Sequence, residues 1–343
     1  MSLSYINSNK LQHHLDSLHK WSKGELIPPI TVEIQPSAAC NHRCYYCMSK
    51  EVQGPITMTE EQIRIAVSRL CLLGVKGLII SGGGEPLVCQ HTMKAIETAH
   101  AIGMDVGLIT NGVLLDYDKR RVVLDKCTWI RFSIDAASTY AYTLIRGRDD
   151  LREVQDNIHT LLEMRRRRDS KTTIGVQMVV NDYNHGEIKA FYDYWVKTDV
   201  DYIQLRPIEL RSSDAITFQK EVFQFISEYP FCSTPNSPKL ILSDRYKMDV
   251  SKIRKYPCLG HQFIGAVDVK GDMYLCCHLI GKASACYGNV FNEEDWVGEE
   301  WKIRRKKAFE SIDYDDCPFL CRGAGINSYL NRLKEGFVHE NFL

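Results

Sequence analysis

CNHRCYYC, residues 40–47, carries three thiols at close spacing: Cys40, Cys44 and Cys47. The stretch follows residues 31–35, which alternate as a short strand does, so we expect the thiols to lie in a loop after a strand. Three thiolates can hold three irons of a four-iron cluster and leave the fourth iron open, as a catalytic metal site requires. A zinc knuckle or three unrelated thiols would give the same spacing, so this stretch alone leaves those alternatives open.

The spacing resembles the cluster loop of the radical S-adenosylmethionine (SAM) superfamily, in which an aromatic residue usually precedes the third cysteine, as Tyr46 does here. The resemblance implies that the three cysteines bind a [4Fe-4S] cluster and that SAM chelates its open iron. Reductive cleavage of SAM would then give a 5′-deoxyadenosyl radical that abstracts hydrogen from a substrate. It also implies an external one-electron reductant, such as flavodoxin or ferredoxin.

Composition limits the class of protein further. The chain has 343 residues, with 43 Lys and Arg against 43 Asp and Glu, so no net charge attracts nucleic acid or an anionic membrane. We find neither an apolar run of transmembrane length nor the apolar core of a signal peptide. Thirteen cysteines without an export signal are typical of metal ligands and free thiols. We therefore expect a cytoplasmic protein without nucleic-acid or membrane partners.

Strand-like and helix-like stretches alternate over the first two thirds of the chain. One helical pattern opens with a capping box at Thr59 and Gln62. The pattern predicts an α/β fold, a partial (β/α)6 TIM-like barrel with its site at the carboxyl ends of the strands. The expected strands are residues 31–35, 77–81, 105–110, 129–135, 173–180 and 202–206.

We expect three regions along the chain. Residues 1–30 form an N-terminal helical extension packed on the outside of the main domain, with Leu11, Leu15 and Leu18 at helical spacing. Residues 31–235 form the radical SAM partial barrel. Residues 236–343 form a small α+β module that follows a loop rich in Ser and Pro.

The expected strands end in residues that match the family's SAM-binding positions. SGGGEP follows the second strand, TNG ends the third, and SID ends the fourth. A guanidinium suits a carboxylate, and an arginine of the family often follows the fourth strand. Ordinary turns and helix caps would also explain these residues. The resemblance implies SAM contacts from Tyr46, Gly83, Gly84, Glu85, Asn111, Ser133, Asp135 and Arg146. By strand alternation, Gln177, Asn181, Gln204 and Arg206 could also face the barrel mouth.

A second group of cysteines follows the expected barrel. Residues 267–275 predict a hairpin around Gly271, and a helix containing Trp296 and Trp301 comes later. The region resembles the auxiliary-cluster module called SPASM or its shorter form, Twitch, although its closing spacing is C-x3-C instead of C-x2-C. The resemblance implies an auxiliary [4Fe-4S] cluster; a structural zinc is the alternative. Its ligands would be Cys258, Cys276, Cys317 and Cys321.

The sequence says less about the reaction on the substrate than about the fold and the cofactors. Cys277 and Cys286 lie near the second group, and either thiol could return a hydrogen atom in an epimerisation, although core filling is an alternative. Without a thiol donor, the expected outcome is two-electron oxidation, with the electron passing to the auxiliary cluster. Arg206 is a further candidate catalytic residue.

The lack of an expected leader-binding domain favours a small polar substrate. The 39 residues before Cys40 are too few for the leader-binding domain of peptide-modifying relatives. We therefore expect a radical SAM oxidoreductase or epimerase acting on a sugar, an aminocyclitol or a nucleotide sugar. A maturase of a ribosomal peptide or protein is the first alternative. A metal-stabilised electron-transfer or binding protein is the second, which metal analysis would distinguish.

Overall fold

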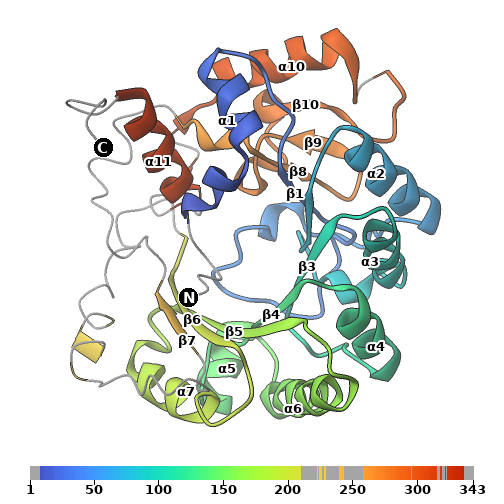
Figure 1. Cartoon of the computed structure of the whole chain (residues 1–343). Coiled ribbons are helices and arrows are strands. Elements are labelled where there is room, and N and C mark those ends of the chain that lie inside the picture. Colours follow the sequence, from blue (N-terminus) through green and yellow to red (C-terminus); the bar gives the residue numbers. More distant parts are fainter. Residues whose placement is uncertain are drawn as a thin grey trace.

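A computed structural model describes residues 8–209, 222, 224–225, 228, 239–242, 258–294, 296–314, 317–318, 321 and 323–335. Within them one ten-stranded sheet has the order β10-β9-β8-β1-β2-β3-β4-β5-β6-β7. Neighbours from β8 through β1 to β7 are parallel, and β9 and β10 are antiparallel additions. The sheet curls around an open centre, with helices outside it (Figure 1). The strands are β1 (Thr31–Ile34), β2 (Gly77–Ile80), β3 (Asp105–Thr110), β4 (Trp129–Ser133), β5 (Thr173–Val180), β6 (Tyr202–Pro207), β7 (Lys239–Leu242), β8 (Ile264–Val267), β9 (Asp272–Tyr274) and β10 (Cys286–Asn289).

The connections between successive strands from β1 to β6 contain helices, as crossovers between parallel strands usually do. The helices are α1 (Leu15–Ser22), α2 (Glu60–Leu72), α3 (Thr92–Ala101), α4 (Tyr117–Lys126), α5 (Thr139–Arg146), α6 (Leu151–Arg168), α7 (Ile188–Trp195), α10 (Gly298–Glu310) and α11 (Ala324–Glu335). Short 3-10 turns are η1 (Ser8–His13), η2 (Lys50–Val52), η3 (Pro86–Val88), η4 (His185–Glu187), η7 (Gly260–Gln262), η8 (Cys277–Leu279) and η9 (Ala283–Ala285). None of the described helices is long and apolar enough to cross a membrane.

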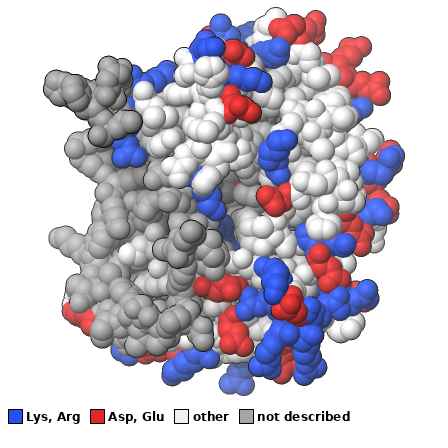
Figure 2. Space-filling view, in the orientation of Figure 1, with Lys and Arg blue, Asp and Glu red and all other residues white. Residues whose placement is uncertain are grey.

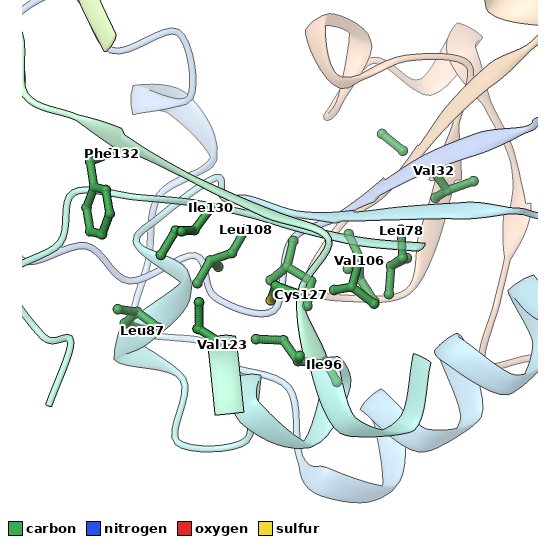
Figure 3. Packing of buried hydrophobic residues seen from close by; sticks show 14 of the residues in the cluster. Val32, Leu78, Leu87, Ile96, Val106, Leu108, Val123, Cys127, Ile130 and Phe132 are labelled. Atoms are coloured by element: carbon green, nitrogen blue, oxygen red, sulfur yellow. The ribbon is translucent and has the colours of Figure 1, made fainter. Parts of the chain in front are cut away.

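The main core lies between the outer face of the sheet and the surrounding helices. Side chains such as Leu108 and Ile130 point from the strands toward Ile96 of α3 and Val123 of α4, and all four are fully buried (Figure 3). Alternation along each strand turns the neighbouring residues toward the barrel interior. Interior positions therefore carry polar residues, among them Arg131 and Ser133 of β4.

The predicted α/β partial barrel is confirmed, and the predicted strands match β1 to β6 with ends shifted by at most two residues. Thr59 and Gln62 form the expected capping box at α2, and β8 and β9 form the expected hairpin. Trp296 was placed wrongly, because it precedes α10 and packs against Arg69 of α2. The Ser- and Pro-rich loop at 233–238 lies outside the described residues.

The C-terminal region continues the barrel's own sheet. β8 pairs with β1 over Thr31↔Ile264 to Ile34↔Val267, and β7 pairs with β6. The expected module at 236–343 therefore contributes a strand next to each end of the six-stranded barrel sheet. The boundary near residue 235 stays a prediction.

The N-terminal extension packs differently from the expectation. Leu11, Trp21 and Ile27 form a second apolar cluster with Phe263 and Leu330, and Leu15 is 70% exposed. The apolar surface that the extension covers comes from η7 and α11 of the C-terminal region.

Candidate active site

A cavity of about 230 Å³ opens at the carboxyl ends of the barrel strands. Cys40, Cys44 and Cys47 line it together with Tyr46, so the first cysteine group faces the interior of the barrel. Lys and Arg side chains are interspersed with Asp and Glu over the visible surface, and a hollow lies near the centre of the view (Figure 2). Most of the other lining residues are polar or charged.

Each thiol of this group accepts a hydrogen bond. The backbone N–H of His42 donates to Cys40 Sγ at 3.4 Å. Arg146 Nη1 donates to Cys44 Sγ and Gln53 Nε2 donates to Cys47 Sγ, both at 3.5 Å. N–H donors aimed at three neighbouring sulfurs suit thiolate ligands, so the residues present fit an iron–sulfur cluster.

Burial raises the pKa of Cys40 to about 11 and raises that of Cys47 as well. Metal binding to Cys40 and Cys47 therefore displaces their protons. Within the described ranges, no group of three His, Cys, Asp or Glu side chains could hold a single metal ion. A cubane binds each thiolate on a different iron, so its ligands stand farther apart than those of one ion.

The glycine loop after β2 packs directly on the cysteine loop. Gly84 N donates to Ser37 O and Glu85 N donates to Ala39 O, both at 2.9 Å. A Cβ on Gly84 would lie 2.1 Å from Ala39 O, so only glycine allows this approach. Gly83 and Gly84 both line the cavity and carry no side chain there, which fits the SAM amino group expected at this loop.

Glu85 and Asn111 fix the ends of β2 and β3 together. The Glu85 carboxylate accepts hydrogen bonds from Leu87 N (3.1 Å), Thr110 Oγ1 (2.6 Å) and Asn111 N (2.9 Å). Burial raises the pKa of Glu85. Asn111 Nδ2 donates to Asn41 Oδ1 in the cysteine loop at 2.7 Å. Both residues line the cavity, and their side chains position the loops around it.

Asp135 and Arg146 form a buried ion pair behind the cysteine loop. Tyr46 Oη also donates to Asp135, and Val179 N donates to its other oxygen at 2.7 Å. Asp135 is fully buried, has a left-handed backbone (φ 65°) and does not line the cavity, and its expected contact with SAM stays a prediction. Ser133, Tyr46 and Arg146 do line it. The alternative of a helix cap does not hold for either Ser133 or Asp135, because Ser138 caps α5.

The opposite wall of the cavity belongs to β4, β5 and β6. Arg206 donates to Gln177 Oε1 at 2.9 Å and to Glu209 Oε1 at 2.5 Å, and all three residues line the cavity. Glu209 Oε2 lies 3.6 Å from His278 Nε2, so this wall is tied to the C-terminal region. Arg131 also lines it and donates to Gln204 at 3.2 Å.

Two of the weaker expectations lie elsewhere. Asn181 is buried, and its side chain donates to Val179 O at 2.8 Å within its own loop. Gln204 is buried, and its Oε1 accepts a hydrogen bond from Arg131. Neither residue lines the cavity.

The second cysteine group gathers around two touching turns. Gly260 and Gly323 approach so closely that a Cβ on Gly260 would lie 3.4 Å from Gly323 O. Burial, followed by the nearby thiols of Cys321 and Cys317, raises the pKa of Cys258. Burial and neighbouring thiols, those of Cys321 and Cys258 included, also raise the pKa of Cys276. Four thiols in one neighbourhood fit the donor set of an auxiliary cluster, whereas among the described residues no three of them stand close enough to hold a single zinc ion.

The two candidate hydrogen donors belong to the C-terminal region. Cys277 begins η8 and Cys286 begins β10, where its Sγ contacts Gly288 O at 3.7 Å. Neither thiol lines the cavity, whereas Arg206 does. Arg206 is thus the member of the expected catalytic group that faces the space available to a substrate.

The sequence analysis missed residues that support the cysteine loop. His42 Nε2 lies 3.1 Å from Asp150 Oδ1, and His42 is 1% exposed. Burial lowers the pKa of His42. His42 stands inside the motif and could have been noticed, but no local pattern pairs it with a residue 108 positions away. Gln53, Glu209 and His278 carried no sequence signal either.

Comparison with known proteins identifies the class. Residues 34–194 match the family model of the radical SAM superfamily, and the chain belongs to that superfamily. GTP 3′,8-cyclase of Staphylococcus epidermidis is 27% identical over 229 residues, which are 61% of this chain and 64% of the cyclase. The chain therefore spans less than two thirds of the length of this curated relative.

Solved structures share the fold. Streptococcus suis SuiB bound to the precursor peptide SuiA has a TM-score of 0.65 at 13% identity and covers 88% of this chain and 73% of its own. The enzyme anSMEcpe with bound AdoMet has a TM-score of 0.60 at 19% identity, over 90% of this chain and 95% of its own. At these identities the likeness concerns the fold alone.

Proposed function

We propose that this radical SAM enzyme oxidises a small polar substrate by removing a hydrogen atom from carbon. The observation that carries the proposal is one cavity with the three cluster thiols on one wall and Arg206, Gln177 and Glu209 on the other. When bound, SAM and the [4Fe-4S] cluster supply the 5′-deoxyadenosyl radical. The protein's own residues then hold the substrate's hydroxyl, amino or phosphate groups against that radical.

The wall opposite the thiols supports a polar substrate. Arg206 is 13% exposed and Glu209 is 10% exposed, so both are held out of bulk water with their hydrogen-bonding groups at the cavity. Buried polar groups of this kind are satisfied by a substrate with matching donors and acceptors and reject an apolar one. A sugar, an aminocyclitol or a nucleotide meets this requirement.

Oxidation is favoured over epimerisation by the positions of the thiols. A thiol that returns hydrogen to a substrate radical must contact it, and neither Cys277 nor Cys286 lines the cavity. In an oxidation of a secondary alcohol, the substrate loses one hydrogen atom to the adenosyl radical. A base would then take the hydroxyl proton, and an auxiliary cluster held by the second cysteine group would accept the remaining electron as the ketone forms.

The test is anaerobic turnover with a reconstituted enzyme. Candidate sugars, aminocyclitols, GTP and short peptides are supplied separately with dithionite and SAM, in deuterated form where available. Deuterium recovered in 5′-deoxyadenosine identifies the substrate class, and a two-electron oxidised product supports the proposal. Deuterium from a peptide only, or solvent deuterium incorporated at an inverted carbon, contradicts it.

The first prediction concerns the cluster ligands. Cys44→Ala removes one of three thiolates, so we expect at least a hundredfold loss of 5′-deoxyadenosine formation while the auxiliary cluster persists. Cys71→Ala is the matched control, because that thiol on α2 belongs to neither group. Cleavage at the wild-type rate in Cys44→Ala would show that these cysteines do not hold the radical-generating cluster.

A further inference from the structure

We propose that Arg146 sets the reduction potential of the first cluster by donating a charged hydrogen bond to Cys44. The inference rests on the proposed function, in which Cys40, Cys44 and Cys47 bind that cluster. It also replaces the expectation that Arg146 binds the SAM carboxylate.

The three groups that donate hydrogen bonds to the cysteine sulfurs of the cluster loop differ in charge. Cys40 receives a backbone amide and Cys47 receives the neutral side-chain amide of Gln53. Cys44 receives the guanidinium of Arg146 at the same 3.5 Å that separates Gln53 from Cys47. Hydrogen bonds from a charged donor are about twice as strong as neutral ones. The arrangement thus gives one of the three sulfurs a charged hydrogen-bond donor.

Arg146 is held in place by its partner on the other side. Its Nη2 pairs with Asp135, whose carboxylate also accepts from Tyr46 and Val179. Asp135 supplies a compensating negative charge in the same buried region, and a guanidinium keeps its proton inside proteins in any case. The guanidinium therefore stays charged, and its side chain is 7% exposed, so water screens it little.

One nitrogen of Arg146 remains available. Nη1 and Nη2 have the partners just named, whereas the buried Nε has no hydrogen-bond partner among the described residues. Arg146 lines the cavity, so this N–H is a second donor for the group that binds there. A buried donor without a partner in the protein would be satisfied by an acceptor supplied by a bound group, such as a sulfide of the cluster.

The direction of the effect follows from charge. Reduction adds one electron to the cluster, and a nearby cation stabilises that electron more than it stabilises the oxidised form. Hydrogen bonds to cluster sulfurs are among the features that set these potentials. Arg146 therefore makes the reduction potential less negative. Asp135 is an anion on the far side of Arg146 from the sulfur of Cys44, and it makes the potential more negative.

The test is a redox titration of the reconstituted protein without SAM, followed by electron paramagnetic resonance. Arg146→Met should make reduction at least tenfold less favourable, which is a shift of 59 mV to more negative potential for one electron. Arg146→Lys keeps the cation and should lie closer to wild type. Gln53→Leu, the matched neutral donor, should shift the potential in the same direction by less than Arg146→Met.

Asp135→Asn distinguishes tuning from simple support. It removes an anion and should shift the potential to less negative values, opposite to Arg146→Met, whereas loss of structural support moves both variants alike. If Arg146→Met binds no cluster, the direction of the potential shift in Asp135→Asn still tests the proposal. A shift to more negative potential, or no shift, in Asp135→Asn would then overturn the inference.

SAM affinity, measured separately by equilibrium binding, separates the two roles of Arg146. If Arg146→Met leaves the reduction potential unchanged but weakens SAM binding, Arg146 binds the SAM carboxylate and does not set the potential. A wild-type protein that binds no reducible cluster would instead refute the proposed function, so the two failures are distinguishable.

Discussion

Gly84 shows how little room separates the two loops that would hold SAM and the cluster. Its backbone lies against Ala38 and Ala39, the residues that lead into Cys40. A methyl group there must displace backbone and not a flexible side chain, because the closest atoms are Ala39 O and Ala38 C. The glycine loop can therefore lie this close to the first cysteine only because Gly84 has a hydrogen atom where other residues have a side chain.

Gly84→Ala should therefore displace the cysteine loop. We expect a loss of about 1–3 kcal/mol in the free energy of unfolding and at least a tenfold weaker affinity for SAM. Gly54→Ala is the control, since a Cβ at Gly54 meets nothing within 4 Å. Chemical denaturation and equilibrium SAM binding measure both effects. Equal behaviour of the two variants would contradict the role given to Gly84.

At the scale of single residues, the sequence predicted what a local motif can carry. The cysteine spacing and SGGGEP identified two facing loops, and both line the cavity. The partners of Asp135 were not predictable, because Tyr46 precedes it by 89 residues and its left-handed backbone depends on its surroundings. A pairing between distant residues leaves no local pattern in one sequence.

Among the elements, α10 has the most unusual contact. Arg305 is fully buried in it and donates to the carbonyls of Ile27, His261 and Gln262. Its guanidinium also lies 5.2–5.6 Å from the ring centres of three aromatic residues: Tyr287, Trp301 and Phe309. One side chain therefore joins the N-terminal segment, η7 and α10.

Arg305→Met should leave those carbonyls without donors while preserving much of the side-chain volume. We expect a loss of about 3 kcal/mol in the free energy of unfolding, since a buried acceptor without a partner costs about 1–3 kcal/mol. Lys306→Met, at the next and exposed position of α10, should change it by less than about 0.5 kcal/mol. Urea denaturation followed by circular dichroism checks this. Similar midpoints for both variants would show that Arg305 does not join the three segments.

Element types followed from periodicity, but element partners did not. The helical spacing of Leu11, Leu15 and Leu18 was informative, yet Leu15 is exposed and the cluster faces the C-terminal region. Periodicity tells which face of a helix is apolar, not which distant surface covers it. For the same reason, the pairing of β8 with β1 could not be read from either strand.

For the whole molecule, the two cysteine groups should be separable in function. Replacing Cys317 and Cys321 with alanine should remove about half of the bound iron and sulfide and leave the first cluster intact. We expect SAM cleavage to continue without substrate oxidation, because the electron from the substrate then has no acceptor. Iron and sulfide content, 5′-deoxyadenosine and oxidised product are the measurements. Zinc in place of iron at this site, or unchanged product, would contradict the prediction.

The ladder between β1 and β8 has a practical consequence for anyone who dissects the chain. β1 pairs with β2 on one side and with β8 on the other. On the β8 side, Ile30 N donates to Phe263 O at 2.8 Å and Gln35 N donates to Val267 O at 2.9 Å. A fragment that stops before Phe263 would bare the backbone of a short, buried strand. Such an edge invites pairing with another copy, so the truncated barrel should self-associate and should not behave as an independent folding unit.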